Sequence, residues 1–298
     1  MSVAAITAAP SAGRLLGSWT FDPGVLTLLV AAATLYGLGV RRTPSWPPLR
    51  VASFLAGLLV LAFALLSGID RYSELMLSVH MFQHLLLMLL APILLLWGSP
   101  VRLALAASPA GGRRILGATL RQPWLRRVSQ PAVGFTVFAS VISLTHLTGL
   151  YEVALRDQFV HALEHAAYFW SGVLFLAPLV AADPLPHPPA PVARFSWLMG
   201  AMTAMAIPGA LLTFQNTVRY PFYLAPAHAL GRSALADQHL AGVVMWIGGG
   251  IAMFALAITV TLQAMLAEER RQQRRESRTL DPLGPLSAVE RPSGASSV

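Results

Sequence analysis

Seven long apolar stretches constrain the fold of this chain more than any other feature. Each is close to the roughly 20 apolar residues that an α-helix needs to cross the hydrocarbon core of a bilayer. They cover residues 24–40, 50–68, 75–97, 131–150, 157–181, 195–214 and 237–264. Charged residues make up 11% of the chain, against about 25% in soluble domains, which is too few to cover a water-exposed surface. The sequence therefore predicts an all-α integral membrane protein, a seven-transmembrane-helix bundle.

The placement of the basic residues predicts how the bundle is oriented. All 21 are arginines, and with seven spans sixteen of them fall on one side of the membrane and five on the other. Arginine accumulates in cytoplasmic loops, so the N-terminus is expected outside and the C-terminus in the cytoplasm of a bacterial cell. We therefore attribute the net charge of +8 to the orientation of the chain in a lipid bilayer, and we expect no nucleic acid as partner.

Breaks in the apolar pattern divide the chain into three parts. Residues 1–23 are expected to form an extracytoplasmic N-terminal segment, and residues 24–266 a single membrane domain. Residues 267–298 form a charged cytoplasmic tail. The tail is expected to be helical over 267–278 and disordered at its end, which is rich in proline, glycine and serine.

Histidines gather towards the expected outer ends of four spans. His80 and His84 lie inside the third span, His146 ends the fourth, His161 and His165 begin the fifth, and His239 begins the seventh. Residues four apart share one face of a helix, so each of the two pairs presents two imidazoles in one direction. Ionisable groups at depth in a membrane usually have a functional reason. The two pairs therefore predict a metal or proton site, whereas a single histidine near a helix end is often only an interfacial polar group.

Other polar and sulfur-bearing side chains accompany the histidines. The chain has no cysteine, so a soft metal must be held by histidine and methionine. Met76 and Met88 extend the stripe of His80 and His84 along the third span. Glu164 lies inside the fifth span, where a carboxylate can orient a ligating histidine. Asp157 and Asp237 begin the fifth and seventh spans, and they either line an entrance or cap the positive helix ends.

Four segments around these histidines carry a resemblance to a known family. They are residues 78–87, 145–155, 161–165 and 237–246. In them the chain resembles the CtaG-type multi-span cytochrome c oxidase assembly factors. It departs from the family pattern Trp-His-x-Pro in the fourth span, where Thr145 and Thr148 flank His146. The resemblance implies an accessory protein that supplies copper to a cytochrome c oxidase subunit.

The primary hypothesis is a non-enzymatic assembly factor, since the chain has no phosphate loop, nucleophile elbow or HExxH motif. Its candidate copper ligands are His80, His84, His161 and His165, with His146 and His239 as further candidates. One alternative is a haem-binding electron-transfer protein, because histidines on opposed helices can hold one haem. Another is a metal or proton transporter, in which embedded ionisable groups form a relay. The sequence does not indicate an oligomeric state.

Overall fold

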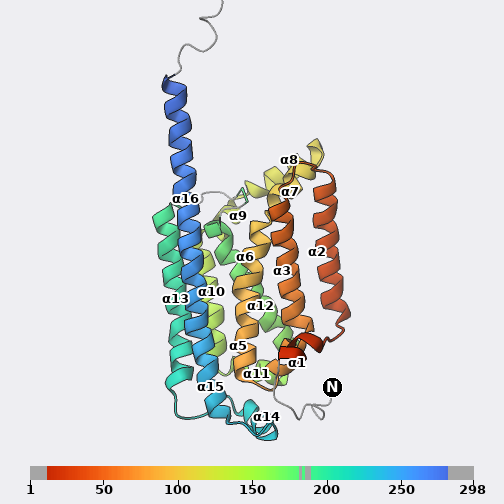
Figure 1. Ribbon diagram of the computed structural model, residues 1–298, viewed down its shortest axis with the longest axis vertical. Coiled ribbons are helices and arrows are strands. Elements are labelled where there is room, and N and C mark those ends of the chain that lie inside the picture. Colours follow the sequence, from red (N-terminus) through yellow and green to blue (C-terminus); the bar gives the residue numbers. More distant parts are fainter. Residues whose placement is uncertain (1–11, 181–182, 185–188, 281–298) are drawn as a thin grey trace, which may run out of the picture.

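Helices account for every regular element in the computed structural model, which describes residues 12–180, 183–184 and 189–280. Long helices pack side by side along the long axis of the molecule, and short helices lie at both ends (Figure 1). This confirms the predicted all-α class. The tail beyond residue 280, predicted to be disordered, and His187 lie outside the described residues.

Six helices are long and apolar enough to cross a membrane, and a seventh span is reached if a bent pair counts as one. The first two are α2 (Pro23–Arg41) and α3 (Pro48–Leu66). The third runs through α5 (Leu77–Leu85), η1 (Leu86–Leu90), α6 (Ala91–Trp97) and α7 (Pro100–Ala107). The others are α12 (Gln158–Val180), α13 (Pro191–Phe214), and the run of α15 (Ala234–Val243), η3 (Val244–Gly248) and α16 (Gly249–Leu280). The helical extension predicted for residues 267–278 is confirmed, because α16 continues through them.

The bent pair replaces the fourth predicted span. Helix α10 (Pro131–Leu147) ends before residue 150, and α11 (Leu150–Arg156) leaves it at 75°. The break is at Thr148, whose backbone is extended and whose hydroxyl oxygen accepts a hydrogen bond from the Leu150 N–H at 3.2 Å. The prediction of one segment over 131–150 is therefore wrong at its end. The turn brings Tyr151 of α11 into the interior, where its side chain is fully buried.

The two ends of the bundle differ in charge. Helices α8 (Ala110–Leu120) and α9 (Pro123–Val128) and the far end of α16 lie at one end, while α1 (Ala12–Gly17), α11 and α14 (Leu224–Ala229) lie at the other (Figure 1). The first end carries the arginine-rich loops. The second carries the five remaining arginines, which are Arg14, Arg71, Arg156, Arg219 and Arg232. The predicted difference in arginine number between the two sides is therefore a difference between the two ends of the structure. Which end faces the cytoplasm stays a prediction.

A backbone contact sets the position of α12. A Cβ on Gly172 of α12 would lie 2.1 Å from the carbonyl oxygen of Met88 in η1, so the two helices touch with no side chain between them. A π-helical segment such as η1 is a local bulge that shifts the faces of the helix on either side of it. About two turns before Gly172, α12 carries His165, and about three turns before it, His161. The contact therefore fixes the height at which these histidines meet α5.

Replacing Gly172 by alanine should destabilise the protein, because the added methyl must displace the Met88 backbone. Overpacking of this kind costs about 1–3 kcal/mol. The measurement is the thermal unfolding of the detergent-solubilised protein. Gly37→Ala in α2 is the matched control, since an added Cβ there meets nothing within 4 Å. Equal unfolding temperatures for the two variants would contradict the close contact.

Candidate metal centre

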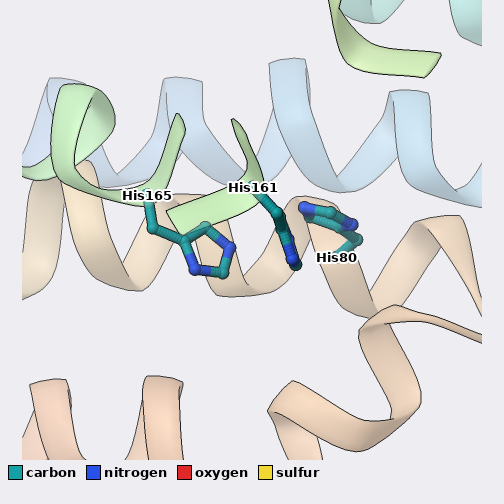
Figure 2. Close-up of side chains that lie close together, drawn as sticks. All are labelled: His80, His161 and His165. Carbon is teal, nitrogen blue, oxygen red and sulfur yellow. The ribbon is translucent and has the colours of Figure 1, made fainter. Parts of the chain in front are cut away.

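Four imidazoles meet between α5 and α12. His80 and His84 come from α5 and are almost fully buried, with exposed fractions of 0% and 2%. His161 and His165 come from the first turns of α12 and are half-buried. Figure 2 shows the rings of His161 and His165 beside the ring of His80. The structure thus brings together the two pairs that helical spacing placed on single faces.

Two overlapping sets of these side chains are close enough for their ligand atoms to hold an ion. Ring centroids lie 4.4 Å apart for His80 and His84, 5.1 Å for His80 and His161, and 4.2 Å for His161 and His165. Ligand atoms of His80, His161 and His165 all lie within 4.8 Å of one another, and so do those of His80, His84 and Glu164. The two sets share His80, which places it at the centre of the chamber. We use the name histidine chamber for His80, His84, His161, His165 and Glu164.

Several polar atoms in the histidine chamber have no partner. Both carboxylate oxygens of Glu164 are buried without a hydrogen bond, as are Nε2 of His161, Nε2 of His165 and Nδ1 of His84. Only 6% of Glu164 is exposed. Buried charges are normally paired or coordinate a metal, because an isolated one loses its hydration without compensation. The chamber therefore offers donor atoms that nothing within the described protein satisfies.

Hydrogen bonds assign the tautomer of His80. The hydroxyl of Tyr223, in η2 (Pro221–Tyr223), donates to the carbonyl oxygen of Ser73 at 2.9 Å. Burial raises the pKa of Tyr223 well above 10.0, so the hydroxyl keeps the proton that it donates. Nδ1 of His80 lies 2.9 Å from the same hydroxyl oxygen and must therefore donate its own hydrogen. Nε2 of His80 is then left with its lone pair directed at His84 Nε2, 3.0 Å away.

This geometry suits a metal ion. Two nitrogens on one tetrahedral ion lie about 3.3 Å apart when each metal–nitrogen bond is about 2.0 Å, which is close to the separation of His80 Nε2 and His84 Nε2. Ligating histidines usually donate their other N–H to an oxygen, which fixes the ring. Tyr223 provides that oxygen for His80. The residues present fit an ion held by imidazoles and one carboxylate.

His146 lies next to the histidine chamber, on its α10 side. Its ring centroid is 6.4 Å from that of His84, and its Nε2 is 3.3 Å from Sδ of Met81. Its Nδ1 lies 3.1 Å from the carbonyl oxygen of Ile142, an acceptor that assigns the hydrogen to Nδ1. Nε2 of His146 and the Met81 sulfur thus face each other as two electron-pair donors. A thioether beside an imidazole is a donor pair that suits reduced copper.

The other predicted residues have structural partners. His239 Nε2 lies 3.0 Å from the Gln215 carbonyl, and among the described residues its ring touches none of these imidazoles. Asp157 caps α12 by accepting from the N–H groups of Phe159 and Val160, as the capping alternative predicts. Asp237 accepts from Ser78 and ties α15 to the start of α5. Met76 and Met88 are buried in apolar clusters, and Met88 also packs against Gly172.

Comparison with known proteins identifies the family. The profile of the cytochrome c oxidase caa3 assembly factors matches residues 34–266. The chain belongs to this family. It is 31% identical over 282 residues to proteins of Mycobacterium bovis and Mycobacterium tuberculosis, and 29% identical to one of Mycobacterium leprae, each described as uncharacterized. These matches cover 89% of this chain but only 41% of the relatives, so the chain spans about two fifths of their length. No solved structure matches.

In this member of the family, the sequence did not predict the aromatic side chains that surround the histidine chamber. The ring of Tyr168 stacks on His84 at 4.0 Å, and Tyr151 lies 5.2 Å from His80 and 4.5 Å from Tyr220. Tyr168 is three residues from His165 on α12, a spacing that could have indicated it. Tyr151 lies in α11, directly after the bend that follows α10, and Tyr223 ends the short 3-10 helix η2. No periodic pattern places such residues.

Replacing Tyr223 by phenylalanine should weaken metal binding without unfolding the protein. The change removes the acceptor that holds His80 in its ligating tautomer, and losing such a partner costs about 10–100-fold in affinity. The measurement is titration of the purified protein with cuprous ion and a competing chelator. Tyr36→Phe is the control, because its hydroxyl donates a buried hydrogen bond to Gly98 far from the chamber. An unchanged affinity in Tyr223→Phe would contradict the tautomer assignment.

Proposed function

We propose that this caa3 assembly factor binds a copper ion in the histidine chamber and passes it to a cytochrome c oxidase subunit in a bacterial cytoplasmic membrane. Copper is here a cargo, so the chamber must hold it and also release it. The observation that carries the proposal is the set of unsatisfied donors around Glu164. An ion among them would offset the buried carboxylate and use lone pairs that no described residue satisfies.

The donor types support copper over other ions. Imidazole suits copper, zinc and iron, whereas thioether sulfur favours copper in its reduced state. Met81 lies against His146, which lies beside His84 in turn. A cuprous ion can therefore exchange nitrogen for sulfur ligands within one connected group. Cysteine, the other soft ligand that selects reduced copper, is absent from the sequence, so methionine is the sulfur ligand that the chain offers.

The position of the chamber supports delivery at the outer face. His161 lies in the first turn of α12, directly after α11, and its ring is 5.1 Å from that of His80. Helices α11 and α14 lie at the end of the bundle opposite α8 and α9 (Figure 1). If the positive-inside rule holds, that end faces outward and the N-terminus is outside. Tyr220 and Arg219 hold the covering loop in place by donating to the His146 carbonyl oxygen. A partner that moves this loop would gain access to the ligands.

The geometry gives less support to the two alternatives. A haem held from both sides needs a flat slot between opposed histidines, but His84 Nε2 lies 3.0 Å from His80 Nε2 and its ring occupies that space. A transporter needs a polar path across the bilayer. Farther along α10 and α12 from the histidines, the interior is filled by apolar side chains, among them Phe138, Phe175 and Leu179. The short distance between His80 and His84 disfavours a haem, and the apolar packing beyond the site disfavours a path across the membrane. Both favour a site that opens towards one face of the membrane.

Replacing His80 and His84 together by alanine should abolish copper retention, because the double variant removes both α5 ligands. Elemental analysis and visible absorbance of the purified protein measure metal and haem. The copper content of the oxidase from cells carrying the variant should fall as well. His228→Ala with His239→Ala is the control, since His228 is exposed and His239 hydrogen-bonds elsewhere.

A normal copper content of the oxidase in cells that carry the His80/His84 double variant would contradict the proposal. A Soret band in the wild-type protein would revive the haem alternative. Uptake of copper into sealed vesicles would instead favour a transporter. Each result can be read only if the variant inserts into the membrane, which is checked by its yield and its elution from size exclusion.

Glu164→Gln should weaken binding of copper while leaving the shape of the chamber intact. The amide keeps the size of the side chain but removes the negative charge that offsets the ion. We expect at least a tenfold loss of cuprous affinity, about the effect of 1.4 kcal/mol. Glu152→Gln in α11 is the charge-matched control, because Glu152 pairs with Arg156 outside the chamber. Equal affinities for the two variants would show that Glu164 does not face the ion.

A further inference from the structure

A cavity lies at the arginine-rich end of the bundle, away from the histidine chamber. It has a volume of ≈ 930 Å³ and lies between α3, α7, α13 and α16. Its charged lining residues are Arg50, Arg102, Arg194, Arg271, Asp183 and Glu268. We call it the arginine cavity. Four arginines from four different helices line one space at the ends of membrane spans.

The two acidic residues of the arginine cavity are already engaged. The Asp183 carboxylate accepts hydrogen bonds from the backbone N–H groups of Arg102 and Val101, at 2.8 Å and 3.3 Å. Glu268 pairs with Arg271 at 3.7 Å, one turn along α16. Within the described part of the chain, no carboxylate forms an ion pair with Arg50, Arg102 or Arg194. The Asp183 carboxylate still offsets part of the charge of Arg50 and Arg102. With four arginines against two carboxylates, the lining keeps a net positive charge.

The donors that face the cavity suit a phosphate group. Arg194 uses Nε to hold the Pro189 carbonyl at 2.8 Å, which leaves its terminal nitrogens for another acceptor. The Arg50 guanidinium lies 5.1 Å over the centre of the Trp46 ring, an arrangement that orients the group but satisfies none of its N–H donors. The buried indole N–H of Trp97, also in the lining, has no partner among the described residues. Planar guanidinium forks match phosphate oxygens in pairs.

The surroundings of these donors point to a lipid as the source of the phosphate. Apolar side chains of Leu49, Val180 and Ala264 line the same cavity. Headgroup phosphates lie at the ends of transmembrane helices, and basic pockets between such helices bind anionic headgroups. We propose that the arginine cavity binds an anionic phospholipid, with its phosphate on Arg50, Arg102 and Arg194 and its acyl chains against the apolar wall.

The test is native mass spectrometry of the full chain in neutral detergent with added lipid. Wild type should bind phosphatidylglycerol about tenfold more tightly than phosphatidylcholine of the same acyl chains. This comparison uses only the wild-type protein, so it stands even if a variant fails to fold. Equal binding of the two lipids would overturn the proposal.

A pair of variants locates the lipid. Arg50→Gln with Arg102→Gln should abolish the preference for phosphatidylglycerol, whereas Arg113→Gln with Arg114→Gln should keep it. The second pair removes the same charge from exposed positions of α8 at the same end of the bundle. Loss of the preference in both pairs would reveal a general charge effect and refute a site. Displacement of the lipid by inorganic phosphate would refute the lipid as the occupant and identify a soluble phosphate site.

Discussion

A polar atom buried between membrane-spanning helices must find its partner inside the protein, and that requirement organises the histidine end of this bundle. Ser73 lies between α3 and α5 in the chain, Tyr223 comes from η2 far along the sequence, and His80 comes from α5. One chain of hydrogen bonds joins all three. It fixes the loop over the chamber and the tautomer of the central histidine at once. Structure and chemistry here depend on the same two hydrogen bonds.

Helical periodicity made part of this site predictable. Spacings of four put His80 with His84 and His161 with His165 on single faces, and Glu164 stood out as an acidic residue inside an apolar span. Low charge and long apolar runs likewise predicted the multi-span bundle. The bend after Leu147 was not predictable in this way, because it depends on a local turn at Thr148. Tyr151 and Tyr223 reach the chamber only through such turns, so their roles appear only in three dimensions.

Side-chain contacts separate the histidines that cluster together from those that do not. His239 begins a span at a similar position to His161, yet its ring turns to the Gln215 carbonyl. His146 ends a helix, as an interfacial histidine would, yet it is 2% exposed and faces Met81. For a single residue, the position in a span gives the depth of the side chain but not the direction in which it points from the helix axis. Pairs on one face remove that ambiguity.

Charge balance bears on the oxidation state of the proposed copper ion. The imidazoles are neutral when they act as ligands, so the one carboxylate, Glu164, sets the charge of the group. A cuprous ion would bring the total to zero, whereas a cupric ion would leave a net positive charge among buried residues. A neutral total costs least in an apolar interior. The single carboxylate and the thioether of Met81 therefore favour reduced copper by independent routes, one through charge and one through the preference of sulfur for a soft ion.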